Sequence, residues 1–386
     1  MSKDQDSRQA GDGSREQHDA DVGVKFAYWV PNVSGGLVVS KIEQRTHWEY
    51  EYNRKLAVLA ENSGFEYALS QVRYMASYGA EFQHESTSFS LALLLATEQL
   101  KVIAAVHPGL WHPGVLAKLT ATADHLSNGR IAVNVVSGWF KGEFTALGEP
   151  WLEHDERYRR SEEFIRALRG IWTEDSFNLR GDFYRITDFS LKPKPVQTPH
   201  PEIFQGGNSK AARAMAARVS DWYFMNGNSL EGVRAQVGEI RAAAASAPGG
   251  GRRVRFGLNA FIIARDTERE AREVLREIIA KADVEAVNGF GEAVKQAGKA
   301  APEREGMWSD SSFDDLVQYN DGFKSGLVGT PEQIAERIVA YRAVGVDLVL
   351  GGFLHYLEDV EQFGKKVLPI VRELEKKRSQ QARQAA

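Results

Sequence analysis

The alternation of short apolar runs with amphipathic segments limits the possible folds of this chain more than any other feature of its sequence. Eight runs are predicted to be buried strands, and nearly all are followed by a segment with helical periodicity. A repeated strand–helix unit predicts a parallel sheet, because parallel strands need a crossover connection. The predicted strands are residues 25–30, 67–70, 102–106, 131–136, 202–205, 221–225, 254–264 and 347–351.

Eight such units favour an α/β fold of the (β/α)8 TIM-barrel type, with a doubly wound sheet as the alternative. The chain has 386 residues, well over 100 more than the ~250 of a typical barrel, so insertions are expected. No G-x-G-x-x-G motif follows an early strand, which weakens the alternative. The predicted helices are residues 51–63, 91–99, 113–126, 159–172, 210–219, 230–245, 267–282, 331–344 and 357–375.

Two stretches interrupt the repeat, at about 139–158 and 284–328. They contain Gly, Pro and clustered aromatic residues without a clear period. We expect them to be lid insertions over the C-terminal face of the barrel, where barrel enzymes keep their chemistry. We therefore predict a single barrel over residues 24–376, a disordered polar tail at 1–23 and a frayed tail at 377–386.

Composition excludes several classes of site. The chain has no cysteine, which rules out disulfides, thiolate metal sites and cysteine nucleophiles. Its net charge of −4 argues against a general nucleic-acid or membrane-surface role. No apolar run approaches the ~20 residues of a spanning helix, and the first 22 residues have no apolar signal region. We expect a soluble cytoplasmic protein.

One segment has the pattern of a phosphate-binding turn. The strand at 202–205 runs into Gly206, Gly207, Asn208 and Ser209 and then directly into a helix. Glycines allow close approach of an anion, and the free N–H groups at a helix N-terminus favour one. A plain strand–helix turn with an Asn/Ser cap fits the same pattern.

Polar residues also stand where apolar ones are expected. Asn134 lies within the apolar strand IAVNVV, and a buried amide must find hydrogen-bond partners. A flavin's pyrimidine edge is one such partner, and a neighbouring strand is the other. Residues 154–158 (HDERY) precede a helix, with His154 or Asp155 as the expected cap.

Three histidines follow predicted strands. These are His107, His112 and His355, but their spacing and the lack of a nearby carboxylate pattern do not support a metal site. No metal is expected.

Four segments together resemble the bacterial luciferase-like flavin monooxygenase superfamily, in particular the branch that contains alkanesulfonate and dimethyl sulfone monooxygenases. The resemblance runs from about Lys25 to Glu375. The opening FAYWVPNVSGGLVVSKIEQRT looks specifically like the dimethyl sulfone enzymes. The four segments are 123–139 (ADHLSNGRIAVNVVSGW), 154–158 (HDERY), 203–212 (IFQGGNSKAA) and 326–338 (GLVGTPEQIAERI).

The resemblance implies a two-component enzyme. Its cofactor would be FMN, supplied as FMNH2 by a separate NAD(P)H:FMN reductase, with O2 forming a C4a-(hydro)peroxyflavin as oxidant. Members of the family often form homo-oligomers, dimers or tetramers. Ser70 and Gln71 would lie near the flavin N5, and Asn134 and Ser137 near the ring edge. The phosphate would be held by Tyr158, Gly207, Asn208 and Ser209.

Departures from the alkanesulfonate branch indicate the substrate. Where that branch has an Arg and a His on the seventh strand, a His after the first and a Tyr after the eighth, this chain has Asn259, Phe261, Asn32 and Phe353. A sulfonate needs charge-assisted donors, so a pocket without them suits a neutral sulfone. Substrate-pocket candidates are therefore Asn32, Phe261 and Phe353, and catalytic candidates are His355, Asn259 and His107.

The expected reaction is oxidation of dimethyl sulfone to methanesulfinate and formaldehyde. The alternatives are oxidation of alkanesulfonates or other organosulfur compounds, a deazaflavin-dependent oxidoreductase and a flavin-storage barrel. Arg73 or Lys324 would weaken the preference for a neutral substrate if either side chain reached the pocket.

Overall fold

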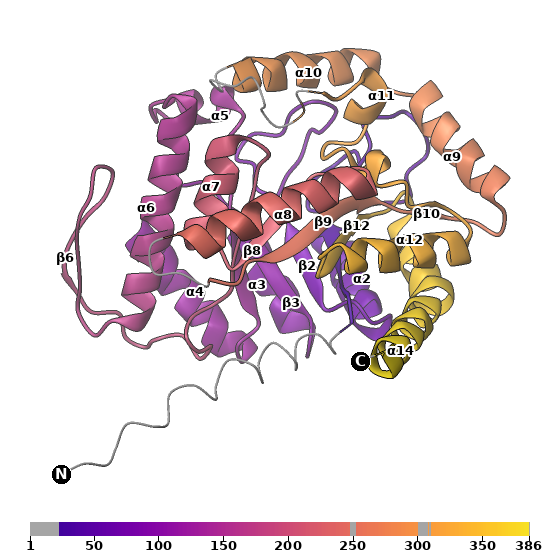
Figure 1. The fold of residues 1–386 in the computed structure, drawn as a ribbon. Coiled ribbons are helices and arrows are strands. Elements are labelled where there is room, and N and C mark those ends of the chain that lie inside the picture. The colour runs from indigo at the N-terminus through magenta and orange to yellow at the C-terminus, as the bar shows by residue number, and fades with distance from the viewer. Residues whose placement is uncertain (1–22, 248–251, 300–307, 309, 386) are drawn as a thin grey trace, which may run out of the picture.

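The computed structural model describes residues 23–247, 252–299, 308 and 310–385, and its centre is a closed barrel of eight parallel strands (Figure 1). The neighbour order is β1-β12-β9-β8-β7-β4-β3-β2, and β1 pairs with both β2 and β12. Closure confirms the predicted barrel and excludes the open doubly wound sheet. Each predicted strand contributes one barrel strand: β1 Lys25–Val30, β2 Tyr67–Ser70, β3 Lys101–Val106, β4 Ile131–Val135, β7 Ile203–Gly206, β8 Trp222–Met225, β9 Arg255–Phe261 and β12 Leu348–Gly352.

Helices surround the barrel on the outside (Figure 1). Some of these helices begin with ordinary capping features. Pro113 occupies the first turn of α4, and Thr330 and Gln333 form a capping box at the start of α12. The outer helices are α2 Tyr50–Asn62, α3 Ser86–Ala96, α4 Pro113–Ser127, α6 His154–Thr173, α7 Lys210–Val219, α8 Leu230–Ser246, α9 Glu268–Ala280, α12 Pro331–Ala343, α13 Tyr356–Gln362 and α14 Leu368–Ala385, the last two joined by a π-turn at Phe363–Val367.

Smaller elements occupy the insertions. The sequence did not indicate α10, because Gly289 and Gly291 lower its helical propensity, yet Val287, Phe290 and Val294 form a buried face at helical spacing. These elements are α5 Lys141–Ala146, α10 Val284–Lys299, α11 Phe313–Leu316, a 3-10 turn at Gly322–Ser325, the hairpin of β5 Phe177–Arg180 and β6 Arg185–Phe189, and the pair β10 Ile263–Ala264 and β11 Val328–Gly329.

Three other predictions about the elements need correction. The strand expected at 254–264 divides at Ile262, whose N–H donates to Gly352 O, and its end pairs with β11 instead. Helix α6 begins at His154, so neither His154 nor Asp155 caps it; Glu153 holds that position without a side-chain bond. The tail expected to fray at 377–386 continues α14 as far as Ala385. Of the N-terminal tail expected at 1–23, only Gly23 is among the described residues.

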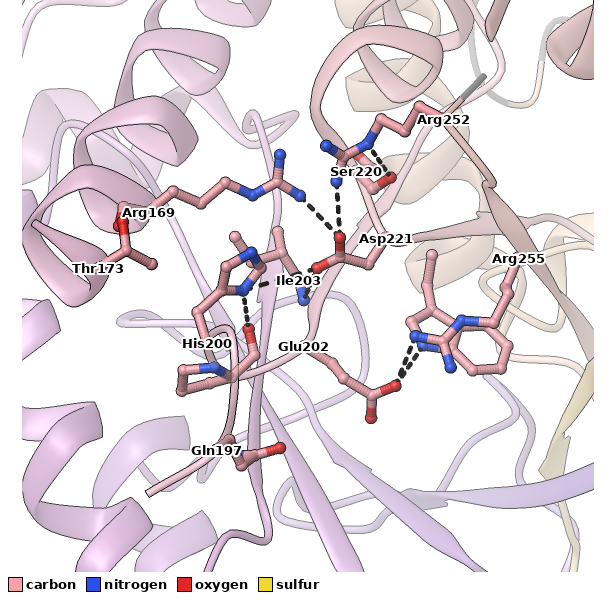
Figure 2. A network of polar contacts seen from close by, with 12 residues as sticks. Arg169, Thr173, Gln197, His200, Glu202, Ile203, Ser220, Asp221, Arg252 and Arg255 are labelled. Atoms are coloured by element: carbon pink, nitrogen blue, oxygen red, sulfur yellow. Dashed lines mark hydrogen bonds and ion pairs between the residues drawn. The ribbon is translucent and has the colours of Figure 1, made fainter. Parts of the chain in front are cut away.

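A charged network around Glu202, which directly precedes β7, lies at the N-terminal end of the barrel, and Figure 2 shows the pair of Glu202 with Arg255. Its carboxylate accepts hydrogen bonds from the first residues of four strands. The donor distances are 2.9 Å from Tyr67 Oη, 3.0 Å from Lys101 Nζ, 2.9 Å from Trp222 Nε1 and 2.7 Å from Arg255 Nη2.

Burial alone would raise the pKa of Glu202, but Arg255 and Lys101 outweigh it and hold the pKa at about 2. The ionised carboxylate therefore stabilises the fold at neutral pH. Asp221, which precedes β8, similarly binds Arg169, Arg252 and the N–H of Ile203 (Figure 2).

No helix in the described part of the chain combines the length and apolarity needed to cross a membrane.

We predict that Glu202→Gln destabilises the protein by about 3 kcal/mol at pH 7, because holding the carboxyl pKa at about 2, well below its ordinary value, corresponds to a free energy of that size. A carboxyl group whose pKa is lower in the folded than in the unfolded protein stabilises the fold at pH values above its unfolded-state pKa. This stabilisation is lost as the pH falls toward the folded-state pKa. The free energy of unfolding of the variant should therefore be lower than that of wild type by the whole amount above about pH 5. This difference should shrink as the pH falls from about 4.5 toward 2.

Denaturant unfolding between pH 7 and pH 3.5 measures this difference. Glu361→Gln is the matched control, since Glu361 pairs with Lys365 on the exposed surface and should change stability by less than ~0.5 kcal/mol. Equal stability of Glu202→Gln and wild type at pH 7 would show that the network contributes nothing.

Candidate active site

A cavity of about 550 Å³ lies at the C-terminal ends of the barrel strands. Every barrel strand contributes at least one lining residue, because alternate side chains point to the interior. The position agrees with the general placement of active sites on this fold. One lining residue from each strand is Trp29, Leu69, Ala105, Asn134, Gly206, Phe224, Asn259 and Leu350.

Four segments cover the cavity, and five aromatic side chains from three of them form what we call the aromatic lid. Trp139 comes from the first predicted insertion and Tyr78 from residues 71–83. The other three come from the second predicted insertion. Residues 300–307 and 309 of that insertion lie outside the described residues. Ring centroids are 5.3 Å apart for Trp139 and Phe290, and 4.9 Å apart for Phe290 and Tyr319. The aromatic lid consists of Tyr78, Trp139, Phe290, Trp308 and Tyr319.

Sequence reasoning did not predict that the segments 33–46 and 71–83 cover the cavity. The sequence feature that could have identified these two segments is their length, because long connections without regular structure are uncommon in compact domains unless they are functional.

The turn after β7 has the features of an anion cradle. Gly206 and Gly207 line the cavity, and Gly207 has φ +129°. A Cβ on Gly207 would lie 2.8 Å from the Tyr158 hydroxyl oxygen, so only glycine leaves this approach open. Ser209 caps α7 by accepting from Ala212 N at 3.2 Å, and Asn208 Oδ1 accepts from Gln236 Nε2 at 3.3 Å.

Tyr158 lies beside this turn. Burial raises the pKa of Tyr158, and a hydrogen bond with Ser209 opposes that rise, so the hydroxyl stays protonated and able to donate. The N-terminus of α7 therefore brings its free backbone N–H groups, at the positive end of the helix dipole, close to the hydroxyls of Tyr158 and Ser209.

Asn134 lies on the cavity wall with its amide oxygen buried and without a hydrogen-bond partner among the described residues. Such an orphaned acceptor costs ~1–3 kcal/mol unless a ligand satisfies it. Gln71 also lines the cavity. Its backbone N–H donates to Asn32 Oδ1 at 3.1 Å and its carbonyl accepts from Asn32 Nδ2 at 3.0 Å. Ser70 is fully buried below it, and Ser137 Oγ accepts from Ser161 Oγ at 2.9 Å.

Several predicted site residues are not part of the cavity wall. Asn32 is the buried clamp of Gln71 rather than a pocket residue. Phe261 packs on Phe323, and Phe353 packs among Phe65, Tyr356 and Phe363 in the core. The substrate pocket expected from these three residues is therefore not where the structure has its open space.

The catalytic candidates also have different placements. His355 Nδ1 accepts from Arg45 N at 3.2 Å, so it anchors the covering segment 33–46 from outside the cavity. Asn259 does line the cavity. Its oxygen accepts from Trp29 Nε1 at 2.5 Å and its amide donates to Asn320 O at 2.7 Å, which ties the second insertion to β9.

His107 lies behind the cavity wall in a buried pair with Glu143 of α5. His107 Nδ1 is 2.8 Å from Val136 O and so donates to it, while Nε2 is 3.4 Å from Glu143 Oε2. Burial lowers the pKa of His107 to about 4, although Glu143 opposes the change. The other Glu143 oxygen accepts from the N–H groups of Tyr74 and Met75, which fixes the segment 71–83.

Arg73, in the same segment, brings a cation to the cavity. Its guanidinium carbon lies 4.1 Å from the Trp139 ring centroid, a cation–π contact. Of the two cations considered from the sequence, Arg73 is the one that reaches the pocket, because it lines the cavity. Lys324, the other candidate, pairs with Asp321 at 3.3 Å instead.

Comparison with known proteins gives a consistent result. Residues 24–348 match the luciferase-like monooxygenase family. The chain is 71% identical to the FMNH2-dependent dimethylsulfone monooxygenase of Pseudomonas putida over 92% of this chain and 97% of that protein. It is 70% identical to the enzyme of the same description from Pseudomonas fluorescens (strain Pf0-1), over 94% of this chain and 98% of that protein.

Solved structures share the architecture. Riboflavin lyase, with a modified FMN and its substrate riboflavin, superimposes with a TM-score of 0.78 over 91% of this chain and 92% of that chain. Its sequence identity of 20% makes this a likeness of fold alone.

We predict that Glu143→Ala loosens the segment 71–83. Losing two charge-assisted hydrogen bonds, each worth ~1.5–3 kcal/mol, should raise amide hydrogen exchange at Tyr74 and Met75 at least ~10-fold. Lys141→Ala, at an exposed position of the same helix, is the matched control and should leave exchange unchanged. Wild-type exchange rates in Glu143→Ala would exclude this anchoring role.

Proposed function

Because the chain belongs to the luciferase-like monooxygenase family, we infer from its relatives and its cavity that it is an FMNH2-dependent dimethylsulfone monooxygenase. The observation that carries this inference is identity of 70% or more to two enzymes of that description over nearly their whole length. One dimethyl sulfone, one O2 and one FMNH2 give methanesulfinate, formaldehyde, FMN, water and a proton. The C–S bond of one methyl group breaks, and that carbon is oxidised.

The cavity fits reduced FMN in two independent ways. The turn at Gly207–Ser209 with Tyr158 suits a phosphate dianion, and the unpartnered oxygen of Asn134 suits a donor on the flavin ring. We propose that these residues, with Gln71 in the wall, hold the cofactor. When bound, reduced FMN supplies the two electrons that activate O2.

The protein's own contribution is to orient the reactants and exclude water. The aromatic lid covers the cavity with ring faces and edges, which are suited to pack against the methyl groups of a sulfone. Asn259 keeps one amide hydrogen beyond its bond to Asn320, and we propose that it donates to a sulfone oxygen. Ser70, Ser137 and His107 support the wall from behind it.

Reduced flavin must come from a separate reductase, and O2 is the second co-substrate. A cytoplasmic location and assembly into dimers or tetramers stay predictions, as does the division into one barrel with two lids.

A coupled assay tests the function. With an NAD(P)H:FMN reductase and excess dimethyl sulfone, methanesulfinate and formaldehyde should appear in equal amounts and only when FMN, O2 and the protein are all present. Conversion of alkanesulfonates but not sulfones would return the substrate to the alkanesulfonate class. Flavin oxidation without either product, or activity with a deazaflavin alone, would overturn the monooxygenase assignment.

A second prediction concerns the phosphate. The double variant Asn208→Ala, Ser209→Ala should bind FMNH2 at least ~10-fold more weakly, because charge-assisted hydrogen bonds at a helix N-terminus are worth ~1.5–3 kcal/mol each. The chain provides a matched control in Asn228 and Ser229, where the same residue pair caps α8 with an identical 3.2 Å bond to Gly232 N.

Anaerobic titration with reduced FMN measures both double variants. Asn228→Ala, Ser229→Ala should lose only capping stability, ~1 kcal/mol, and keep its flavin affinity. Equal FMNH2 affinity in the two double variants would remove the Gly207–Ser209 turn from the phosphate site.

A further inference from the structure

Arg73 is a cation on the cavity wall without a carboxylate partner. Among the described residues, its polar contact is a hydrogen bond from Nη1 to Val72 O at 3.1 Å, and no carboxylate lies within 4.0 Å of its guanidinium nitrogens. The Trp139 ring beneath it fixes the plane of the guanidinium but provides no hydrogen-bond acceptor. N–H groups of the Arg73 guanidinium therefore remain available to a ligand in the cavity.

Among the described residues, no neighbouring charge forms an ion pair with this cation. Glu143 has one oxygen on the N–H groups of Tyr74 and Met75 and the other facing His107. Lys41, which also lines the cavity, has an exposed side chain that pairs with Asp283 at 3.8 Å. Burial lowers the pKa of Arg73, and Glu143 opposes the change, yet arginine stays protonated in proteins. A guanidinium that has lost part of its hydration without gaining an ion pair binds an anion favourably.

The reaction converts a neutral molecule into an anion within this cavity. Dimethyl sulfone has no charge, whereas the methanesulfinate left after C–S cleavage carries one negative charge on two oxygens attached to sulfur. Two oxygens on one centre match the paired N–H donors of a guanidinium, as a carboxylate does.

We propose that Arg73 is the anion-binding residue of the cavity and that it holds the sulfinate product through its two oxygens. The chemical class of the anion rests on the proposed function, and the existence of the anion site rests on the geometry alone. The neutral sulfone gains only ordinary hydrogen bonds from the same group, so product binds more tightly than substrate. Added sulfinate then inhibits competitively with the sulfone.

Binding of sodium methanesulfinate to the FMN-loaded protein, measured by titration calorimetry, tests the site without any catalytic turnover. Arg73→Met should raise the Kd for methanesulfinate at least ~10-fold, because a charge-assisted bond is worth ~1.5–3 kcal/mol. Arg73→Lys keeps the charge but loses the paired donors, so its Kd should lie between those of wild type and Arg73→Met. Arg234→Met, at an exposed position on α8, is the matched control and should bind like wild type.

Kinetics separate this role from a purely structural one. In Arg73→Met the inhibition constant of methanesulfinate should rise at least ~10-fold, while KM for dimethyl sulfone should change less than ~3-fold. Unchanged sulfinate binding in Arg73→Met overturns the proposal even if the sulfone is still oxidised. Weaker FMNH2 binding with unchanged sulfinate binding also overturns it, because the guanidinium would then serve the flavin.

The two proposals fail separately. If no sulfone is oxidised but methanesulfinate binds in an Arg73-dependent way, the anion site stands and the assigned substrate falls. If Arg73→Met does not fold, the comparison of Arg73→Lys with wild type decides, and equal sulfinate affinity in those two proteins contradicts paired recognition by the guanidinium.

Discussion

Closure of the parallel sheet determines where this protein can bind a ligand. In a closed barrel of eight strands, alternate side chains point to the interior and fill it, so a cavity forms only where the strands end. At the N-terminal end Glu202 draws together the first residues of four strands, and this charged network occupies the space. The cavity lies at the opposite end, where the connections are long and their side chains can be chosen for chemistry instead of closure.

Fixed anchors hold those long connections over the cavity. Glu143 binds the segment 71–83 through two backbone N–H groups, His355 holds the segment 33–46 through Arg45 N, and Asn259 ties Asn320 to β9. Each anchor is a polar side chain whose hydrogen-bonding capacity is mostly used inside the protein. Asn134 differs from them because its oxygen has no partner, and Arg73 because its charge has none, so these two groups point to ligands.

The strand pattern was sufficient to predict the barrel, because each of the eight apolar runs assigned as strands forms one barrel strand. Turn chemistry likewise indicated the segment Gly206–Ser209. Site residues that depend on tertiary packing were harder to assign. Phe261 and Phe353 have the side chains expected of a pocket, yet they lie in the core. The prediction failed because a sequence does not show on which side of a strand end a ring packs. The sequence indicated Arg73 only as one of two cations able to reach the pocket, because nothing local distinguishes it from a solvated arginine. Its contact with Trp139, which comes from a distant insertion, is a product of tertiary packing.

The central claim is that reduced flavin occupies the C-terminal cavity with its phosphate at the start of α7 and its ring against Asn134. A crystal structure of the protein with FMN bound measures this most directly. The predicted result is a phosphate group on the N–H groups of the Gly207–Ser209 turn beside Tyr158, with the Asn134 oxygen accepting a hydrogen bond from the ring. A phosphate bound elsewhere, with the Asn134 oxygen still without a partner, would contradict it.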